Sequence, residues 1–444
     1  MNYMRLWRVW LRILLAGLLA GVCLPAADLA TLTILHINDL HAQLTPMQND
    51  VGGMARLAGL IRRERAGCKD CLLLEAGDVV QGSPVSTIFK GLPVYEILNL
   101  LRFDVGTLGN HEFDYGWQQA RKFVDSATQA TVLANLVDAK GGSFLPKPYV
   151  ILPVNGLRVA VIGLITADMK DLSTPALMGP WQVSPVYQAA QRYAAEARKK
   201  ADVVVLLGHL NTIEEAAVLH NIPEIAIVVT GHAHNGMQAP LSEGNRVLVR
   251  VKSNGQELGR LETVVDKETK SLASWNWKRI PVNEKAPVAE DVAVQVKRWE
   301  DEVTSVVDQP IGRAMREIPA QEVRRLIEKA MREATGADFA FMNPGGVRDK
   351  LPMGQLLARH VWNIMPFDNL VVTARVKGSA LPPAVTQGAA VDPDKVYTLA
   401  VSDFTAANMS APGQLGVSGL EFGKDGPLLR DVIIDWVRRQ KVLE

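Results

Sequence analysis

The chain has 444 residues, which is enough for two or three domains with separate hydrophobic cores. Its composition, with 48% hydrophobic, 21% charged and 6% aromatic residues, is that of an ordinary globular protein. The formal net charge is +1, so no excess of one sign attracts a nucleic acid polymer or an anionic membrane, and we expect neither as a partner.

The first 27 residues have the layout of a secretory signal peptide. Three arginines precede a mostly apolar run over residues 13–24, and small residues follow at 25–27. A membrane-spanning helix needs about 20 apolar residues, which makes the run short for a retained anchor, the alternative interpretation. We therefore expect residues 1–27 to be removed and the chain to be exported, to the periplasm or outside the cell, without stable membrane insertion.

Two cysteines, Cys68 and Cys71, follow the leader. In a cytosolic protein such a C-x-x-C pair indicates redox chemistry or half of a zinc site. An exported protein meets oxidising conditions, which favour a short-loop disulfide instead.

Residues 28–283 alternate short apolar runs with helical patterns. Helical spacing of apolar residues occurs at 93–102 and 185–200. The apolar runs are rich in Val, Ile and Leu, as strands buried on both faces are, and lie at 31–37, 71–76, 159–165, 202–207 and 225–230. The alternation predicts an α/β fold with helices covering the sheets.

Residues 284–308 begin with a polar stretch and continue as a charged helical pattern near 288–303, which predicts a linker helix. From residue 309 to residue 444 the pattern restarts with a helix at 320–334 and strands near 370–376 and 396–401. This segment is predicted to be a second, smaller α/β domain.

Polar residues and glycines follow the predicted strands of the first domain. Ligands of open α/β sheets gather beyond the carboxyl ends of the strands, so these clusters are expected to converge on one site. The residues are Asp39, His41, Asp78, Asn110, His111, His209, His232 and His234. The other histidines, His36, His220 and His360, lie outside such clusters and are predicted to serve the fold or the surface.

The clusters offer carboxylate, amide and imidazole donors without a thiolate. This set suits zinc, manganese or iron and disfavours a closed structural zinc site. All members except His111 are candidate ligands, more than one tetrahedral ion needs, so we predict two divalent ions bridged by Asp78. Two ions about 3.5–4 Å apart clamp both oxygens of an in-line displacement and make hydroxide available near pH 7.

On these motifs the chain resembles the 5′-nucleotidase family of calcineurin-like metallophosphatases, which includes periplasmic nucleotidases and UDP-sugar hydrolases. The matching motifs are Asn38-Asp39-Leu40-His41, Gly77-Asp78, Gly109-Asn110-His111-Glu112-Phe113-Asp114, Gly208-His209 and Gly231-His232-Ala233-His234. The resemblance implies a catalytic β-sandwich flanked by helices and a C-terminal substrate-binding domain. It also implies one ion held by Asp39, His41, Asp78 and His234, and another held by Asp78, Asn110, His209 and His232.

His111 and Asp114 are predicted to form a catalytic dyad. Asp114 lies three residues after His111, near enough to orient its ring, and a His–Asp pair beside two cations can stabilise phosphoryl charge. The resemblance assigns the same dyad and implies direct attack by metal-bound water or hydroxide. Asp114 is also a candidate N-cap for a helix over 115–124.

Selectivity is expected to come from the second domain. The loop from Asn343 to Arg348 resembles the family's N-x-G-G-x-R motif, in which the arginine binds substrate phosphate through a planar bidentate group. Phe367 and Phe404 resemble two rings that stack on a nucleobase. The substrate is thus expected to be a small-molecule nucleotide or another phosphate ester.

The chain departs from the family after Phe404, where nucleoside-specific members carry G-G-D-G-[FY] and this chain has Thr405-Ala406-Ala407-Asn408. Because of this departure, the sequence does not identify the leaving group of the substrate. Besides a 5′-nucleotidase or a nucleotide-sugar hydrolase, related scaffolds include 2′,3′-cyclic nucleotide phosphodiesterases and thiosulfohydrolases. A non-catalytic binding protein is the alternative from another class, and the complete ligand set argues against it. The sequence leaves the oligomeric state open.

Overall fold

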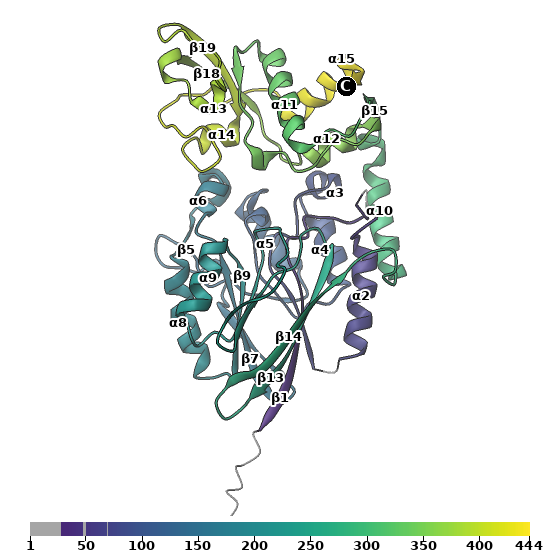
Figure 1. Ribbon diagram of the computed structural model, residues 1–444, viewed down its shortest axis with the longest axis vertical. Coiled ribbons are helices and arrows are strands. Elements are labelled where there is room, and N and C mark those ends of the chain that lie inside the picture. The colour runs from purple at the N-terminus through teal and green to yellow at the C-terminus, as the bar shows by residue number, and fades with distance from the viewer. Residues whose placement is uncertain (1–27, 48–49, 69) are drawn as a thin grey trace, which may run out of the picture.

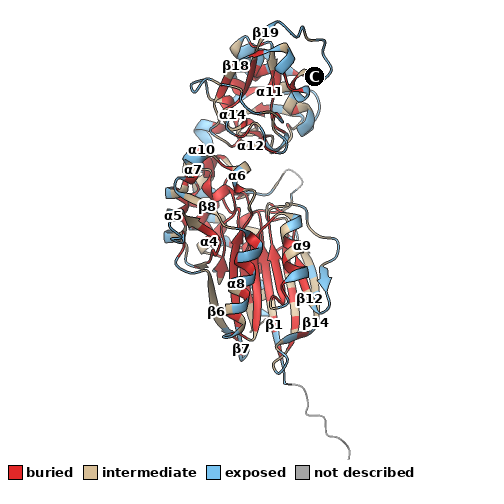
Figure 2. Cartoon of the chain, turned by 90° about the vertical axis from the view of Figure 1, so that its left-hand side faces the viewer, coloured by how far each residue is buried: buried red, intermediate tan, exposed pale blue. Residues whose placement is uncertain are grey.

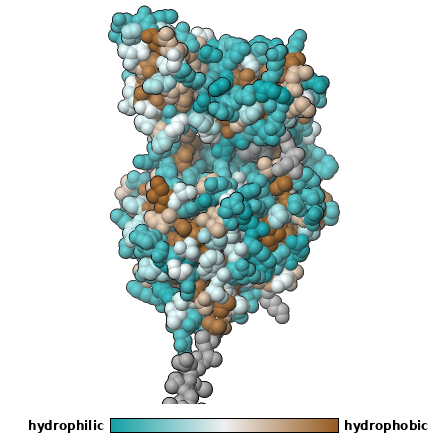
Figure 3. All heavy atoms as spheres, viewed as in Figure 1, coloured by the Kyte–Doolittle hydropathy of each residue, from teal (hydrophilic) through white to brown (hydrophobic). Residues whose placement is uncertain are grey.

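A computed structural model describes residues 28–47, 50–68 and 70–444 (Figure 1). The predicted signal peptide, residues 1–27, lies outside this part of the chain. Among the described helices, none combines the length and the apolar character needed to cross a membrane. Figure 3 shows a mostly hydrophilic face with small, separated hydrophobic areas.

The N-terminal part contains two six-stranded sheets that pack face to face. Apolar side chains from both sheets, such as Ile34 and Val205, are fully buried between them. The first sheet has the order β14 (Ser271–Pro281), β13 (Glu257–Asp266), β1 (Leu29–Ile37), β2 (Cys71–Glu75), β3 (Val105–Gly106), β4 (Ala130–Thr131). The second has the order β11 (Leu241–Glu243), β12 (Arg246–Val249), β10 (Ile227–Thr230), β9 (Val203–His209), β7 (Leu157–Ile165), β6 (Tyr149–Val154).

Helices cover the outer faces of this sandwich, and the central strands are buried on both faces (Figure 2). The helices α2 (Met54–Ala66) and α4 (Leu92–Asn99) pack on the first sheet, and α8 (Val186–Arg198) and α9 (Thr212–Asn221) pack on the second. The buried faces explain the uninterrupted Val/Ile/Leu runs of the sequence. The predicted α/β class and sandwich are confirmed.

The strands that precede the polar clusters run in parallel. β1 pairs in parallel with β2 and β2 with β3, while β9 lies between β7 and β10 with parallel pairing to both. Parallel strands place their carboxyl ends at one edge of each sheet. The two edges meet at the end of the sandwich that faces the C-terminal part (Figure 1).

A long helix, α10 (Glu290–Val307), leads from the sandwich to the C-terminal part and begins and ends slightly later than the predicted 288–303 segment. The C-terminal part has two three-stranded sheets. Their orders are β17 (Gly354–Leu357), β15 (Pro310–Ala314), β20 (Val442–Leu443), and β16 (Phe339–Ala340), β19 (Val396–Ser402), β18 (Val371–Lys377). Helices α11 (Ala320–Thr335) and α15 (Leu429–Gln440) pack against each other beside them.

Cys68 and Cys71, the first residue of β2, form a disulfide, as the oxidising-compartment interpretation predicted. The predicted N-cap role of Asp114 is wrong. The helix α5 (Trp117–Ser126) begins after Gly116, whose φ of 86° only glycine adopts readily, so Asp114 lies before the cap.

Candidate active site

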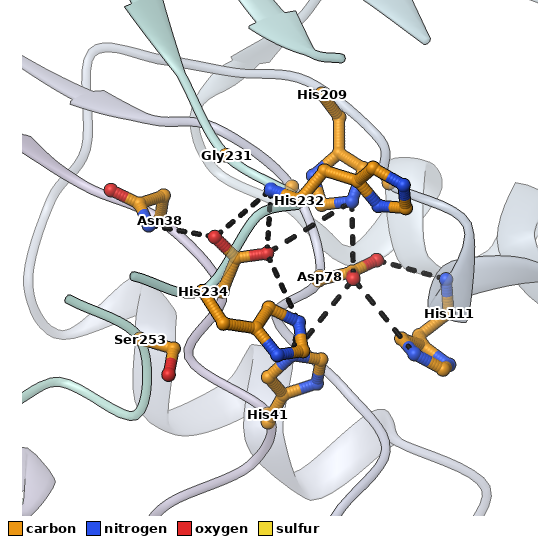
Figure 4. Close-up of polar contacts among 12 residues, drawn as sticks. Asn38, His41, Asp78, His111, His209, Gly231, His232, His234 and Ser253 are labelled. Atoms are coloured by element: carbon orange, nitrogen blue, oxygen red, sulfur yellow. Dashed lines mark hydrogen bonds and ion pairs between the residues drawn. The ribbon is translucent and has the colours of Figure 1, made fainter. Parts of the chain in front are cut away.

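The predicted ligands gather where the two sheet edges meet. Figure 4 shows them around Asp78, with His41 and His234 on one side and His209 and His232 on the other. Several adopt a left-handed backbone that non-glycine residues rarely take: φ is 50° at Asp39 and His41, 54° at Asp78, 79° at His232 and 59° at His234. Strained conformations of this kind cluster at functional sites, where the surrounding structure fixes them.

Main-chain hydrogen bonds hold these loops against each other. Asp39 N donates to Gly77 O at 3.0 Å, and His41 N donates to Asp78 O at 2.9 Å. His232 N donates to both carboxylate oxygens of Asp39, at 2.8 and 3.0 Å. The loops after β1, β2 and β10 therefore form one connected structure.

The first donor group consists of Asp39, His41, Asp78 and His234. Each residue offers one ligand atom, and these atoms all lie within 4.8 Å of one another. His41 Nε2 lies 2.9 Å from His234 Nε2 and 3.9 Å from Asp78 Oδ2. His234 Nε2 lies 3.7 Å from Asp39 Oδ1. These four residues are the set that the family resemblance implies for one ion.

The second group shares Asp78 and adds His209 and His232. His209 Nε2 lies 3.1 Å from Asp78 Oδ2 and 3.2 Å from Asn110 Oδ1. Asn110 is thus placed beside the group, as the resemblance implies for the other ion. The arrangement in two groups that share one carboxylate matches the predicted bridging position of Asp78.

The chemistry of the two groups fits divalent cations. Asp78 Oδ2 is buried between them without a hydrogen-bond partner among the described residues, although it lies within ion-pair distance of three imidazoles. Burial lowers the pKa of His209, but the carboxylates of Asp78 and Asp39 outweigh it and raise the pKa to about 10. Asp78 and Asp39 thus favour positive charge at this point of the site, which ions coordinated by imidazole and carboxylate would supply.

Residues behind the donors fix their orientation. His209 Nδ1 lies 2.9 Å from Ala76 O, so its Nδ1–H is donated to the carbonyl and Nε2 faces Asp78. Glu112 accepts four main-chain N–H groups, from Asp78 (3.0 Å), Val79 (2.8 Å), Val80 (3.3 Å) and Gly109 (2.6 Å). Glu112 thus ties the loop after β2 to the loop after β3. The sequence motif contains Glu112, but nothing in its pattern predicted this role.

The structure brings His111 and Asp114 together beside Asp78. His111 Nδ1 lies 2.7 Å from Asp114 Oδ2, and His111 Nε2 lies 4.0 Å from Asp78 Oδ2. Burial alone would lower the pKa of His111, but the carboxylates of Asp114 and Asp78 outweigh it and raise the pKa. The arrangement favours a charged imidazolium that can donate from Nε2 toward a group bound next to Asp78.

A cavity of about 780 Å³ extends from the two groups to the C-terminal part. All four predicted substrate residues line it: Asn343, Arg348, Phe367 and Phe404. The ring of Phe367 lies 6.1 Å from that of His111, so the two parts of the chain meet at this cavity. Thr87 Oγ1, in α3 (Pro84–Ile88), also donates to Pro366 O at 3.0 Å.

The cavity has further polar wall residues that the sequence did not indicate. Gln81 follows Asp78 by three residues in the chain, Asp168 precedes the short helix α6 (Met169–Leu172), and Asp403 precedes Phe404. Asp403 Oδ1 accepts from Asn369 Nδ2 at 2.9 Å and from two main-chain N–H groups. Such residues come from segments far apart in the chain, and no spacing connects them.

The three remaining histidines lie away from the cavity. His36 is fully buried and accepts a hydrogen bond from Trp277 Nε1, and His360 accepts one from Leu357 N. His220 is on the exposed side of α9, 3.1 Å from a Glu243 oxygen. Their prediction as fold or surface residues agrees with these positions.

Known families match both parts of the chain. The calcineurin-like phosphoesterase family matches residues 32–236, and the 5′-nucleotidase C-terminal domain matches residues 303–387. The chain is 27% identical to protein UshA of Yersinia enterocolitica over 88% of this chain and 81% of UshA. It is 26% identical to endonuclease YhcR of Bacillus subtilis over 87% of this chain but only 38% of YhcR, which is much longer.

The fold is shared with a solved structure, the 5′-nucleotidase precursor from Thermus thermophilus. The TM-score is 0.83 at 24% identity, over 93% of this chain and 97% of that one. This likeness shows a common fold, and the family matches add the identity of both domains. The chain thus carries a calcineurin-like phosphoesterase domain in residues 32–236 and a 5′-nucleotidase C-terminal domain in residues 303–387, the two domains that the motif resemblance predicted.

Proposed function

We propose that this chain is an exported two-metal phosphoesterase that hydrolyses a nucleotide or nucleotide sugar. The observation that carries the proposal is one cavity bounded by two donor groups that share Asp78 and, opposite them, by Arg348 and two phenylalanines. The residues proposed to hold the ions and those proposed to select the substrate thus face the same cavity. In this proposal residues 28–283 are the catalytic domain, 284–308 the linker helix and 309–444 the substrate-binding domain, and the leader at 1–27 directs export.

Zinc, manganese or iron would be held by Asp39, His41, Asp78 and His234 and by Asp78, Asn110, His209 and His232. When bound, two such ions neutralise phosphoryl charge and make hydroxide available near neutral pH. Arg348 would present a planar fork of donors to a phosphoryl oxygen, and Asn343 lines the same cavity. The Asp114 carboxylate raises the pKa of His111 and so favours the protonated ring, whose Nε2–H can stabilise the phosphoryl group or assist the leaving oxygen.

The leaving group would lie between Phe367 and Phe404. Both rings line the cavity, and stacking on a base contributes about 1–3 kcal/mol. The absence of the family's acidic residue after Phe404 favours a second candidate on the same scaffold, a 2′,3′-cyclic nucleotide phosphodiesterase or a thiosulfohydrolase.

The purified chain, loaded with Mn²⁺ or Zn²⁺, would be assayed on AMP, UDP-glucose, 2′,3′-cyclic AMP and p-nitrophenyl phosphate, with Arg348→Ala in parallel. The proposal expects AMP or UDP-glucose to have the highest kcat/KM and Arg348→Ala to raise KM. Preference for the cyclic diester would select the phosphodiesterase. Inactivity on all four with two bound ions would favour the sulfur substrate or a binding protein.

Because one relative is named an endonuclease, single-stranded DNA belongs in the same assay. Cleavage of that polymer would contradict the expectation, based on net charge, that nucleic acids are not substrates.

A further inference from the structure

Gln81 is a buried residue of the cavity wall whose side chain has no hydrogen-bond partner in the part of the chain that the structure describes. Only 1% of its surface is exposed, and neither Oε1 nor Nε2 makes a hydrogen bond within the described residues. Buried amides are nearly always paired, because an unpaired one loses its hydrogen bonds to water without replacement. The wall position of Gln81 therefore needs an explanation.

The backbone of Gln81 is also held in an unfavourable conformation. Its φ is 68°, in the left-handed region, and its N–H donates to Ser86 Oγ at 2.9 Å. The next residue must be small, since a Cβ on Gly82 would lie 2.4 Å from His41 O. The chain is thus fixed on both sides of Gln81, and its conformation is imposed by neighbours rather than preferred locally.

The surroundings of Gln81 indicate what its amide can bind. The same cavity wall contains Asp78 and His111 from the catalytic domain and Asn343 and Arg348 from the other domain. Each donor group already offers two imidazoles and two oxygen donors, so neither group needs Gln81 as a further ligand. His111, Asn343 and Arg348 supply N–H donors, the complement of an anion.

We propose that Gln81 is a phosphate-binding residue, whose Nε2 donates a hydrogen bond to an oxygen of the substrate phosphoryl group. This inference rests on the proposed function and extends its donor set by one residue. A neutral amide suits the position, because it adds a donor without adding charge to a cavity that the carboxylate of Asp78 also lines.

The test is equilibrium binding of inorganic phosphate to the Mn²⁺-loaded chain by titration calorimetry, with Gln81→Glu and Gln81→Met. A hydrogen bond to a charged group is worth about tenfold to a hundredfold in affinity. We expect Gln81→Met to weaken phosphate binding by about tenfold and Gln81→Glu to weaken it more, with Mn²⁺ content unchanged. The thermal unfolding midpoint of metal-free Gln81→Met should equal or exceed that of the wild type, since the unpaired amide is removed.

Gln129→Met is the matched control. Gln129 is 7% exposed and its Oε1 also has no partner among the described residues, but it does not line the cavity. We expect this variant to keep wild-type phosphate affinity. Equal phosphate affinity of the wild type and both Gln81 variants would overturn the inference alone, as would loss of Mn²⁺ from the Gln81 variants. Failure of the wild type to bind phosphate would overturn the proposed function as well.

Discussion

The guanidinium of Arg250 and the carboxylate of Glu215 form a buried ion pair behind the loop that carries His232 and His234. Arg250 Nη1 lies 2.6 Å from both Glu215 oxygens, and the two side chains are 6% and 5% exposed. The same guanidinium donates to Asn235 O at 3.0 Å and to Asn235 Oδ1 at 3.4 Å. Arg250 thus fixes the residue next to His234.

Replacing Arg250 with Lys should weaken one ion-binding group more than the other. Lysine keeps a charge opposite Glu215 but cannot present the fork that also holds Asn235. Loss of a residue that orients a ligand typically costs about 10–100-fold in metal affinity. We expect calorimetric titration with Mn²⁺ to show this loss for the group containing His234, and a smaller loss for the other group, in which only His232 lies on this loop.

Arg246→Lys is the control for this prediction. Arg246 begins β12, the strand that Arg250 follows, and donates to Leu219 O and Ile222 O at the far end of α9. Like Arg250, it lies near β12 and α9, but its hydrogen bonds go to the end of α9 and not to the loop of His232 and His234. Equal weakening in both variants would mean that general loosening of the domain, rather than the position of His234, determines metal affinity.

Replacing His111 with Ala should reduce turnover without loss of metal. General acid–base assistance contributes about 10²–10⁴-fold to rate, so kcat should fall by this order. Asp114→Asn should cause a smaller fall, because the amide keeps an oxygen near Nδ1 but no longer stabilises the imidazolium. The measurements are steady-state kinetics on the preferred substrate and metal content. Unchanged turnover in His111→Ala would contradict the dyad.

The sequence predicted the ligand positions because parallel strands bring their carboxyl ends to one edge, wherever the strands lie in the chain. Glu112 escaped prediction because its function is to accept main-chain N–H groups from two loops, which leaves no trace in residue spacing. The left-handed backbone of Asp39 and His41 is equally invisible, since neither is a glycine.

The sequence pattern could not predict the contacts between the two domains, for a different reason. The approach of Phe367 to His111 depends on how the C-terminal domain packs against the sandwich, which no local periodicity encodes. Asp403 shows the same limit, because its place in the cavity follows from its bond to Asn369 and not from a motif.

Replacing Phe404 with Leu should test the nature of the leaving group. If a base stacks on this ring, loss of about 1–3 kcal/mol raises KM for AMP by about tenfold to a hundredfold. Hydrolysis of ribose 5-phosphate, which lacks a base, should change little. Phe339→Leu is the control, since Phe339 packs against Tyr397 away from the cavity. An equal rise in KM for both substrates would show that Phe404 does not bind the base.

Replacing His36 with Gln should flatten the acid side of the stability profile. His36 is fully buried in β1, where its Nε2 accepts from Trp277 Nε1 at 3.1 Å, and burial lowers its pKa to about 3. The unfolded chain protonates this imidazole near pH 6.5 while the folded chain does not. The free energy of unfolding therefore falls as pH decreases from about 6.5 toward 3, by up to about 1.4 kcal/mol per pH unit from this group.

Glutamine does not titrate, and its side-chain oxygen can still accept the Trp277 N–H. Between pH 7.5 and pH 5, the loss of stability in His36→Gln should be smaller than in the wild type by about 2 kcal/mol. Denaturant unfolding of both chains at the two pH values, without added metal, measures this difference. Parallel pH profiles of the free energy of unfolding would contradict this prediction. They would show that the folded chain protonates His36 as readily as the unfolded chain does, despite its burial.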